Sequence, residues 1–154
     1  YAVLADFDHI DEFIPGMKSS EVLSAPDAPI RLRQVGDAGI GPFHTAIDVT
    51  LAVTTDAPTR IDFARVAGNL EQMNGSWIVA GDHARCGIAY RALIEPRFWV
   101  PPLIGPRLMR TQVEQQMQGL LQEIRRRAAG SQQPPAASPG SDDAGHARAV
   151  RQGG

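Results

Sequence analysis

The clearest pattern along the chain is an alternation of apolar and polar residues over positions 43–54, which predicts a long β-strand. Phe43, Ile47 and Leu51 belong to its apolar face, whereas Asp48 belongs to the polar face. Because a shift by one residue would exchange the two faces, we expect the register of this strand to be strongly specified.

Five further strand-like segments surround this one and are separated from each other by Gly, Pro and Asp residues. They cover residues 20–25, 30–35, 60–67, 70–80 and 85–94. Parallel neighbours would need long crossover connections, and the segments here follow one another too closely for that. The pattern therefore predicts an antiparallel meander.

Apolar residues at helical spacing flank the strand-rich region on both sides. We predict a helix over residues 2–10 and a second short helical turn over residues 11–14. A longer helix is predicted over residues 106–128, roughly 34 Å at 1.5 Å per residue. Its apolar stripe is Met109, Val113, Met117, Leu120 and Ile124, widened by Leu108 and Leu121. Its outer face is expected to carry Gln112, Glu114, Gln115, Gln118, Glu123 and Arg125.

This order of elements predicts an α+β fold in which a curved antiparallel sheet wraps around a long C-terminal helix. Side chains of the two layers are expected to leave a cavity where a small molecule binds. Residues 1–129 are predicted to form this one domain. Residues 130–154 contain almost no large apolar side chains and are predicted to be a disordered tail rich in Pro, Ser, Gly and Ala.

The composition narrows the possible partners. A net charge of -2 argues against nucleic acid as the main partner, because phosphate binding needs a clustered positive field. The three arginines at positions 125–127 have two interpretations. They complement the negative end of the helix dipole, or they contact an anionic membrane surface or an acidic partner. Cys86 is the only cysteine, which excludes an intrachain disulfide, and we expect it to be a small buried apolar residue.

Motifs for catalysis or metal binding are absent from the sequence. It contains no nucleophile elbow, zinc-protease helix, phosphate loop or paired-cysteine motif, so we predict no catalytic residue, metal site or cofactor. Nor does any run of about twenty apolar residues predict a membrane span.

The candidate binding residues are apolar or aromatic side chains expected beside the cavity. A buried Trp or Tyr combines apolar area with one polar tip that can hold a ligand carbonyl, and methionine adapts to irregular shapes. Each of these side chains has plain core packing as its alternative role. The candidates are Phe13, Met17, Phe63, Trp77, Tyr90, Met109, Val113, Met117 and Leu120.

Several short motifs occur in an order and at spacings that resemble one group of proteins. They are Asp6-Phe7, Phe13, Ile14-Pro15-Gly16, Ser20-Glu21-Val22, Gly75-Ser76-Trp77, Tyr90 and Pro96. The chain is similar in these motifs to the START and polyketide-cyclase (SRPBCC) superfamily, and most closely resembles its bacterial coenzyme Q-binding-like members. The resemblance implies a helix-grip fold with seven strands. The first strand would precede Tyr1, and one sheet edge of the given chain would then be unpaired.

Three functions remain open at this stage. The resemblance and the predicted cavity favour binding, transport or chaperoning of a hydrophobic small molecule such as a lipid, quinone or polyketide. A cyclase or aromatase would need a polar group inside the cavity, for which Tyr90 is the candidate, with Arg65 or Arg91 stabilising a developing oxyanion. A protein- or membrane-interaction module would use the sheet or the basic end of the helix.

Overall fold

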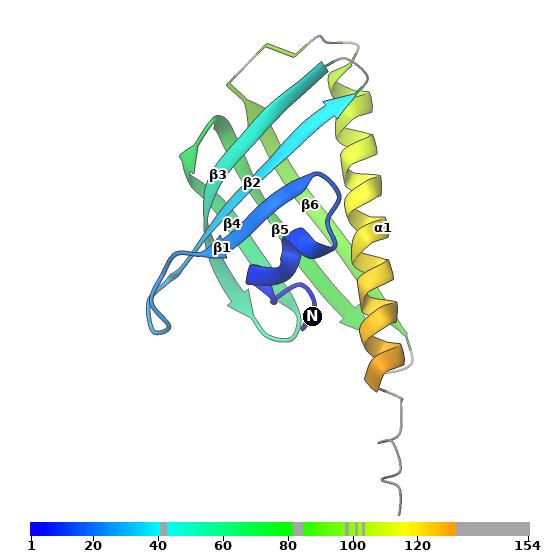
Figure 1. Cartoon of the computed structure of the whole chain (residues 1–154). Helices are drawn as coiled ribbons and strands as arrows, with labels where there is room; N and C mark the ends of the chain where they lie inside the picture. Colours follow the sequence, from blue (N-terminus) through cyan, green and yellow to red (C-terminus); the bar gives the residue numbers. More distant parts are fainter. Residues whose placement is uncertain (41–42, 82–84, 98, 101, 103, 132–154) are drawn as a thin grey trace, which may run out of the picture.

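The structure is a computed structural model that describes residues 1–40, 43–81, 85–97, 99–100, 102 and 104–131. The described part contains a short 3₁₀ helix, six strands and one long α-helix (Figure 1). The predicted succession of strands and the long C-terminal helix are confirmed. The elements are η1 (Phe7–Glu12), β1 (Met17–Val22), β2 (Ile30–Ile40), β3 (Phe43–Asp56), β4 (Arg60–Gly68), β5 (Leu70–Gly81), β6 (Cys86–Pro96) and α1 (Gly105–Ser131).

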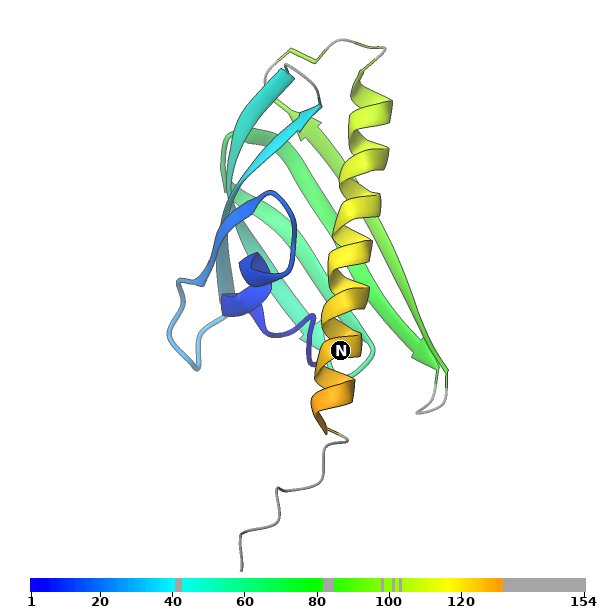
Figure 2. The same ribbon diagram turned by 45° about the vertical axis from the view of Figure 1, so that its right-hand side comes forward.

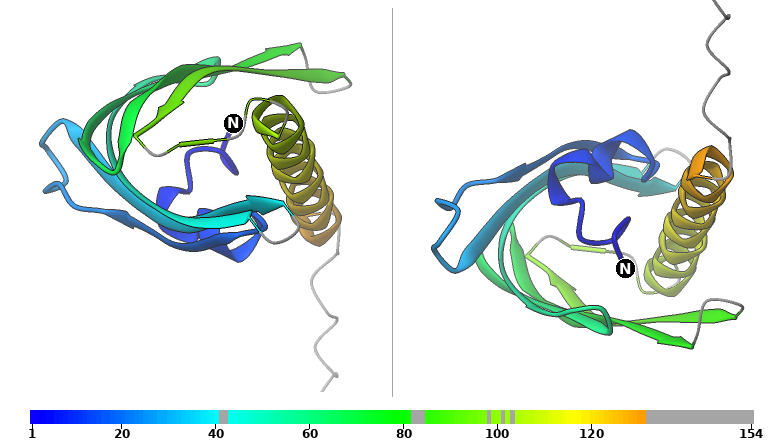
Figure 3. Two further views of the ribbon diagram at one scale, coloured as in Figure 1. Left: turned by 90° about the horizontal axis from the view of Figure 1, so that it is seen from above. Right: turned by 90° about the horizontal axis from the view of Figure 1, so that it is seen from below.

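The strands form one antiparallel sheet in the order β1-β2-β3-β4-β5-β6. Seen along the helix, the sheet is a strongly curved wall, and α1 lies across its open side (Figure 3). Strand twist bends such a meander, and register shifts in the β1–β2, β3–β4 and β5–β6 pairs add local bends.

The alternation predicted for β3 is confirmed. Val49, Leu51 and Val53 are buried, whereas Thr54 on the other face is exposed. The side chain of Phe43, predicted on the same face, lies outside the described part of the structure. Burial of every second residue keeps β3 in register with β2, where Leu32 pairs with Leu51.

The N-terminal segment lies on the concave side of the curved sheet (Figures 2 and 3), and its residues take part in the hydrophobic core. Leu120 of α1 is completely buried there, and the N-terminal Val3 and Leu4 pack into the same cluster. The sheet contributes Leu32, Val49, Leu51, Val53, Ile61 and Phe63. Around this cluster the sheet, the N-terminal segment and α1 form three packed layers.

The two predicted N-terminal helices are wrong. Residues 2–5 form turns, and one 3₁₀ helix of six residues, Phe7–Glu12, follows. Segments this short do not sustain an α-helix by themselves, because nucleation is unfavourable. Asp6, at the N-cap position, makes no capping hydrogen bond. Its carboxylate instead contacts His9 and Arg127, so tertiary contacts decide the conformation here.

Several predicted boundaries also shift. β2 continues through the predicted turn at Gly36-Asp37-Ala38-Gly39, because these residues pair with β3. Helix α1 continues to Ser131, so the first two residues of the predicted tail are helical, and residues 132–154 lie outside the described residues. Cys86 is exposed rather than buried, because it starts β6, an edge strand of the described sheet.

The seventh strand that the family resemblance implies stays a prediction. No helix in the described part of the chain is both long and apolar enough to cross a bilayer.

Candidate functional site

The space between the sheet and α1 is divided into three adjoining chambers. The inner chamber measures about 60 Å³ and lies among Phe63, Trp77, Tyr90 and Leu120. The middle chamber measures about 150 Å³, and the outer chamber about 410 Å³. Met73 of β5 lines all three, so we treat them as one continuous candidate site.

Three aromatic rings form the floor of the inner chamber. Trp77 and Tyr90 are direct partners across β5 and β6, and their ring centroids are 4.3 Å apart. The Phe63 ring stacks on Tyr90 with centroids 6.1 Å apart. It also lies over Gly75, its partner on β5, where a Cβ atom would overlap the ring. Such contacts hold the rings in place, so this end of the cavity is preformed.

Tyr90 supplies one polar group to this apolar floor. Burial raises the pKa of its hydroxyl to about 12, because the ionised form would lose its hydration. The hydroxyl therefore stays protonated at physiological pH. It forms no hydrogen bond with any residue that the structure describes, and it is free to donate one to a ligand oxygen.

The outer chamber is large and apolar. Ile47 of β3, Leu70 of β5 and Ile94 of β6 form its sheet side, and Leu108 and Met109 form its helix side. None of its described lining residues is charged. Its volume falls within the roughly 300–1,000 Å³ that small-molecule pockets occupy.

Glutamines on α1 were missed by the sequence analysis. Gln112, predicted on the outer face, lines the middle and outer chambers, and Gln116 lines the inner and middle chambers. The inward stripe is Leu108, Gln112, Gln116 and Leu120, at intervals of four. The predicted stripe was centred on Met109, Val113 and Met117, with Leu108 only at its margin. Each of these three residues follows an inward one by a single position, which is a rotation of about 100° around the helix. The fully buried Leu120, present in both stripes, does not distinguish them.

The family of the chain can now be stated. The family described as polyketide cyclase / dehydrase and lipid transport matches residues 1–120. The chain belongs to this family. The resemblance to START-like proteins seen in the motifs is thereby confirmed, whereas the coenzyme Q-binding subgroup stays a prediction. A search of curated protein sequences finds no match.

Solved structures share the fold of this chain at low sequence identity. The Zhui aromatase/cyclase from Streptomyces sp. R1128 has a TM-score of 0.67 at 16% identity, over 85% of this chain and 87% of its own. A START superfamily protein from Mycobacterium smegmatis has a TM-score of 0.66 at 16% identity, over 81% and 86%. The protein TTHA0849 from Thermus thermophilus has a TM-score of 0.66 at 15% identity, over 86% and 89%. These similarities establish the helix-grip architecture.

Most of the predicted binding residues of this family member meet in the cavity. Met109 lines the outer chamber, and the half-buried Val113 and Met117 line none of the three chambers. The inner chamber is lined by Phe13, Met17, Phe63, Trp77, Tyr90 and Leu120.

The arginines considered for oxyanion stabilisation lie elsewhere. Arg91 follows Tyr90 on β6 and is exposed, and the Nε atom of Arg65 donates to the carbonyl oxygen of Glu71. Neither lines any of the three chambers. No group of three or more His, Cys, Asp or Glu residues in the described part of the chain is placed to hold a metal ion.

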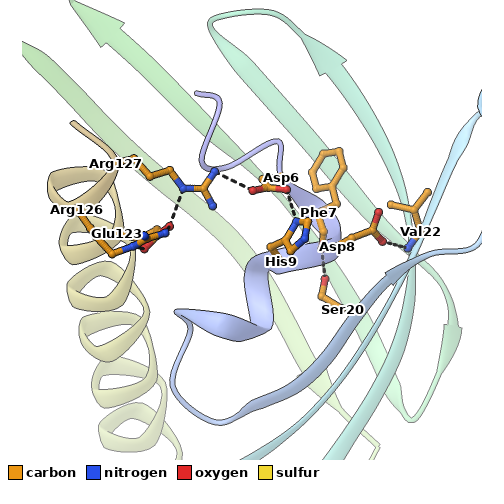
Figure 4. A network of polar contacts seen from close by, with 9 residues as sticks. All are labelled: Asp6, Phe7, Asp8, His9, Ser20, Val22, Glu123, Arg126 and Arg127. Atoms are coloured by element: carbon orange, nitrogen blue, oxygen red, sulfur yellow. Dashed lines mark hydrogen bonds and ion pairs between the residues drawn. The ribbon is translucent and has the colours of Figure 1, made fainter. Parts of the chain in front are cut away.

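A polar network attaches the N-terminal segment to the C-terminal part of α1 (Figure 4). The guanidinium of Arg127 contacts the Asp6 carboxylate at 2.7 Å and donates to Glu123 at 2.6 Å. Arg126 donates twice to Glu123, each at 2.7 Å, and the imidazole of His9 contacts Asp6 at 2.6 Å. Glu123 was predicted on the outer face, but its side chain is only 8% exposed. Two of the three arginines at 125–127 are thus paired within the molecule.

This network shifts the protonation of its members. Hydrogen bonds from Arg126 and Arg127 lower the pKa of Glu123 from its ordinary 4.5 to about 2. The pKa of Asp6 is lowered mainly by its hydrogen bond with His9, and the same bond raises the pKa of His9. The carboxylates therefore stay ionised through mildly acidic pH.

We expect the domain to lose stability as the pH falls from about 4.5 toward 2. A carboxylate whose folded-state pKa lies below its unfolded value stabilises the fold above the unfolded pKa, and protonation on acidification removes that contribution. His9 acts in the opposite sense, since its raised pKa stabilises the fold at low pH and this contribution disappears as the pH rises.

Urea unfolding at pH 7, 4 and 3 measures the acid effect. Glu123→Gln should flatten the pH dependence in this window. Glu114→Gln serves as the control and should keep it, because Glu114 is exposed and Arg110 is its one ion-pair partner among the described residues. Identical pH dependence in the wild type and Glu123→Gln would contradict the assignment of this effect to Glu123.

Proposed function

We propose that this domain binds a hydrophobic small molecule, such as a lipid, quinone or polyketide, in the cavity between the sheet and α1, and carries or protects it there. The observation that supports this most directly is the apolar outer chamber of about 410 Å³ with no charged side chain in its described lining. Burying apolar ligand surface in such a space contributes about 25 cal/mol per Å². The family description, which includes lipid transport, supports the same conclusion.

The chemistry of the inner chamber favours binding over catalysis. Tyr90 is the one ionisable side chain among its described lining residues. With a pKa of about 12, its hydroxyl cannot serve as a general base near neutral pH, since the phenolate is scarcely populated. It remains an effective hydrogen-bond donor to a ligand oxygen.

A cyclase or aromatase activity is the second candidate, and the same tyrosine favours it. A protonated hydroxyl beside the stacked Phe63 ring and the tilted Trp77 ring can hold a planar substrate and donate to a developing oxyanion. In that case the cavity would act chiefly by restricting the conformations of a flexible substrate.

Substituting tryptophan for Met73 is expected to weaken binding of an apolar ligand about tenfold or more, about 1.4 kcal/mol. Met73 lines all three chambers, so an indole there occupies the space that connects them. Fluorescence titration with N-phenyl-1-naphthylamine measures the affinity. Asn74→Trp is the matched control, because Asn74 is the exposed neighbour on the same strand, and it should bind as the wild type does. Circular dichroism checks that both variants are folded.

Two outcomes would count against the proposed function. One is the absence of saturable probe binding to the wild-type protein, and the other is equal affinity in Met73→Trp and Asn74→Trp. Mass spectrometry of compounds recovered from the complex separates the two candidate functions. A ligand recovered unchanged supports binding alone, whereas a product formed by the wild type and lost in Tyr90→Phe supports a cyclase.

A further inference from the structure

Three glutamine side chains lie where the chambers of the cavity meet. Gln34 of β2 and Gln116 of α1 line both the inner and the middle chamber. Gln112, one helical turn before Gln116, lines both the middle and the outer chamber. We call these three residues the glutamine waist. It places amide groups partway along a cavity whose outer end is apolar and whose inner end is apolar apart from the Tyr90 hydroxyl.

The amides of the waist have most of their hydrogen-bonding capacity unused. The side chains of Gln112 and Gln116 form no hydrogen bond with any residue that the structure describes. Gln34 makes only a long contact of 3.4 Å to the hydroxyl of Ser20, whose own proton goes to the carbonyl oxygen of Phe7 at 2.6 Å. An amide offers two donors and one acceptor. In the absence of a ligand these amides can bond to water. A ligand that displaces the water must therefore offer hydrogen bonds in its place.

The charges around the cavity restrict what the waist can hold. The described linings of the inner and outer chambers contain no Asp, Glu, Lys or Arg. The middle chamber is lined by one charged residue, Asp37, which is 43% exposed and paired with Lys18 at 2.7 Å. A charged ligand group at the waist would be desolvated without a counter-ion, which is strongly unfavourable. A neutral carbonyl or hydroxyl would be satisfied by the amides.

We infer that the glutamine waist selects uncharged ligands that carry a carbonyl or hydroxyl oxygen partway along their length, with apolar parts on both sides. This inference rests on the proposed function, because it names the ligand class of the same cavity. A site that hydrogen-bonds a ligand oxygen discriminates against the analogue lacking it more strongly than apolar contacts do, since its own polar groups are otherwise left unpaired.

Three probes with one ring skeleton test the inference: anthracene, 9,10-anthraquinone and anthracene-9-carboxylate. Their affinities are measured by displacement of N-phenyl-1-naphthylamine from the wild type and from Gln34→Leu and Gln116→Leu. Both substitutions should weaken anthraquinone binding about tenfold, the loss of one satisfied hydrogen bond, and leave anthracene unchanged or tighter. The carboxylate should bind the wild type more weakly than the quinone.

Gln115→Leu and Gln118→Leu are the matched controls, because both residues are exposed on α1, and they should keep the wild-type preference. Leucine is a good helix former, so α1 is retained, and Gln116→Ala provides a second variant if Gln116→Leu alters the helix. An unchanged ratio of quinone to anthracene affinity in Gln34→Leu and both Gln116 variants would overturn the inference while the proposed function stands. Tight binding of the carboxylate would overturn the requirement for a neutral ligand. If none of the probes binds, the proposed function itself fails.

Discussion

Replacing Leu120 with alanine is expected to lower the free energy of unfolding by about 2–5 kcal/mol. Leu120 is the one residue of α1 whose side chain is completely buried and apolar, and it packs against the N-terminal segment and the sheet. Truncation removes apolar contacts and leaves a void beside the inner chamber. Packed cores relax only partly into such voids, so most of the lost contact energy is not recovered.

The adjacent leucine provides the control for this experiment. Leu121 is 41% exposed, and Leu121→Ala makes the same chemical change one residue away. We expect it to change stability by less than about 1 kcal/mol. Urea unfolding of the two variants measures the difference. Equal losses in Leu120→Ala and Leu121→Ala would show that α1 does not pack on the sheet through the face described above.

Replacing Gly119 with alanine is expected to destabilise the domain by about 1–3 kcal/mol. A Cβ atom at this position would overlap the carbonyl oxygen of Phe13 and lie 3.0 Å from the Pro15 ring. The N-terminal loop and α1 must then move apart, which strains the link between Asp6 and Arg127. The destabilisation is expected although alanine favours the helix by about 1 kcal/mol over glycine.

Gly130 on the same helix is the matched control. A Cβ atom added there meets nothing within 4 Å, so Gly130→Ala should leave the stability unchanged or raise it slightly. Thermal unfolding followed by circular dichroism compares the two variants directly. If Gly119→Ala proves as stable as Gly130→Ala, the close approach of loop and helix is not a constraint on this fold.

These two substitutions act where the N-terminal segment packs against α1, and the binding predictions act along the cavity. This separation allows stability and ligand affinity to be tested by different variants. Around Leu120, the N-terminal segment, the sheet and α1 pack together. Toward the N-terminus of α1, the sheet and α1 enclose the outer chamber instead. The fold thus combines a packed core with a ligand-sized space.

The cavity-lining residues on the strands were predictable because side-chain direction in a strand depends only on local alternation. Phe63 and Trp77 could be assigned to the concave face from their neighbours in sequence, and both line the inner chamber. Their ring contacts with Tyr90 depend on the register of β4, β5 and β6, which the periodicity does not specify.

The helix face could not be determined in the same way. Apolar residues occur at consecutive positions of α1, as in Leu108-Met109 and Leu120-Leu121, so more than one stripe satisfies the helical period. Contact with the sheet selects the stripe that contains Gln112 and Gln116. In the sequence, Gln112 and Gln116 are polar and would be assigned to the solvent-exposed face. They can lie on the inward face because a cavity separates that part of α1 from the sheet.

The sequence by itself determined the six strands and the long terminal helix, because alternation and helical periodicity are local properties of the chain. It also determined the antiparallel order, because the connections between strands are too short for parallel crossovers. The tertiary structure alone decided the conformation of residues 2–12, the burial of Glu123 and the division of the cavity into chambers. In the sequence, nearly the whole domain separates Asp6 from Arg127, so no local pattern of residues indicates their ion pair. The volume left between two packed layers likewise depends on how far apart the layers lie, and no single segment of sequence encodes that distance.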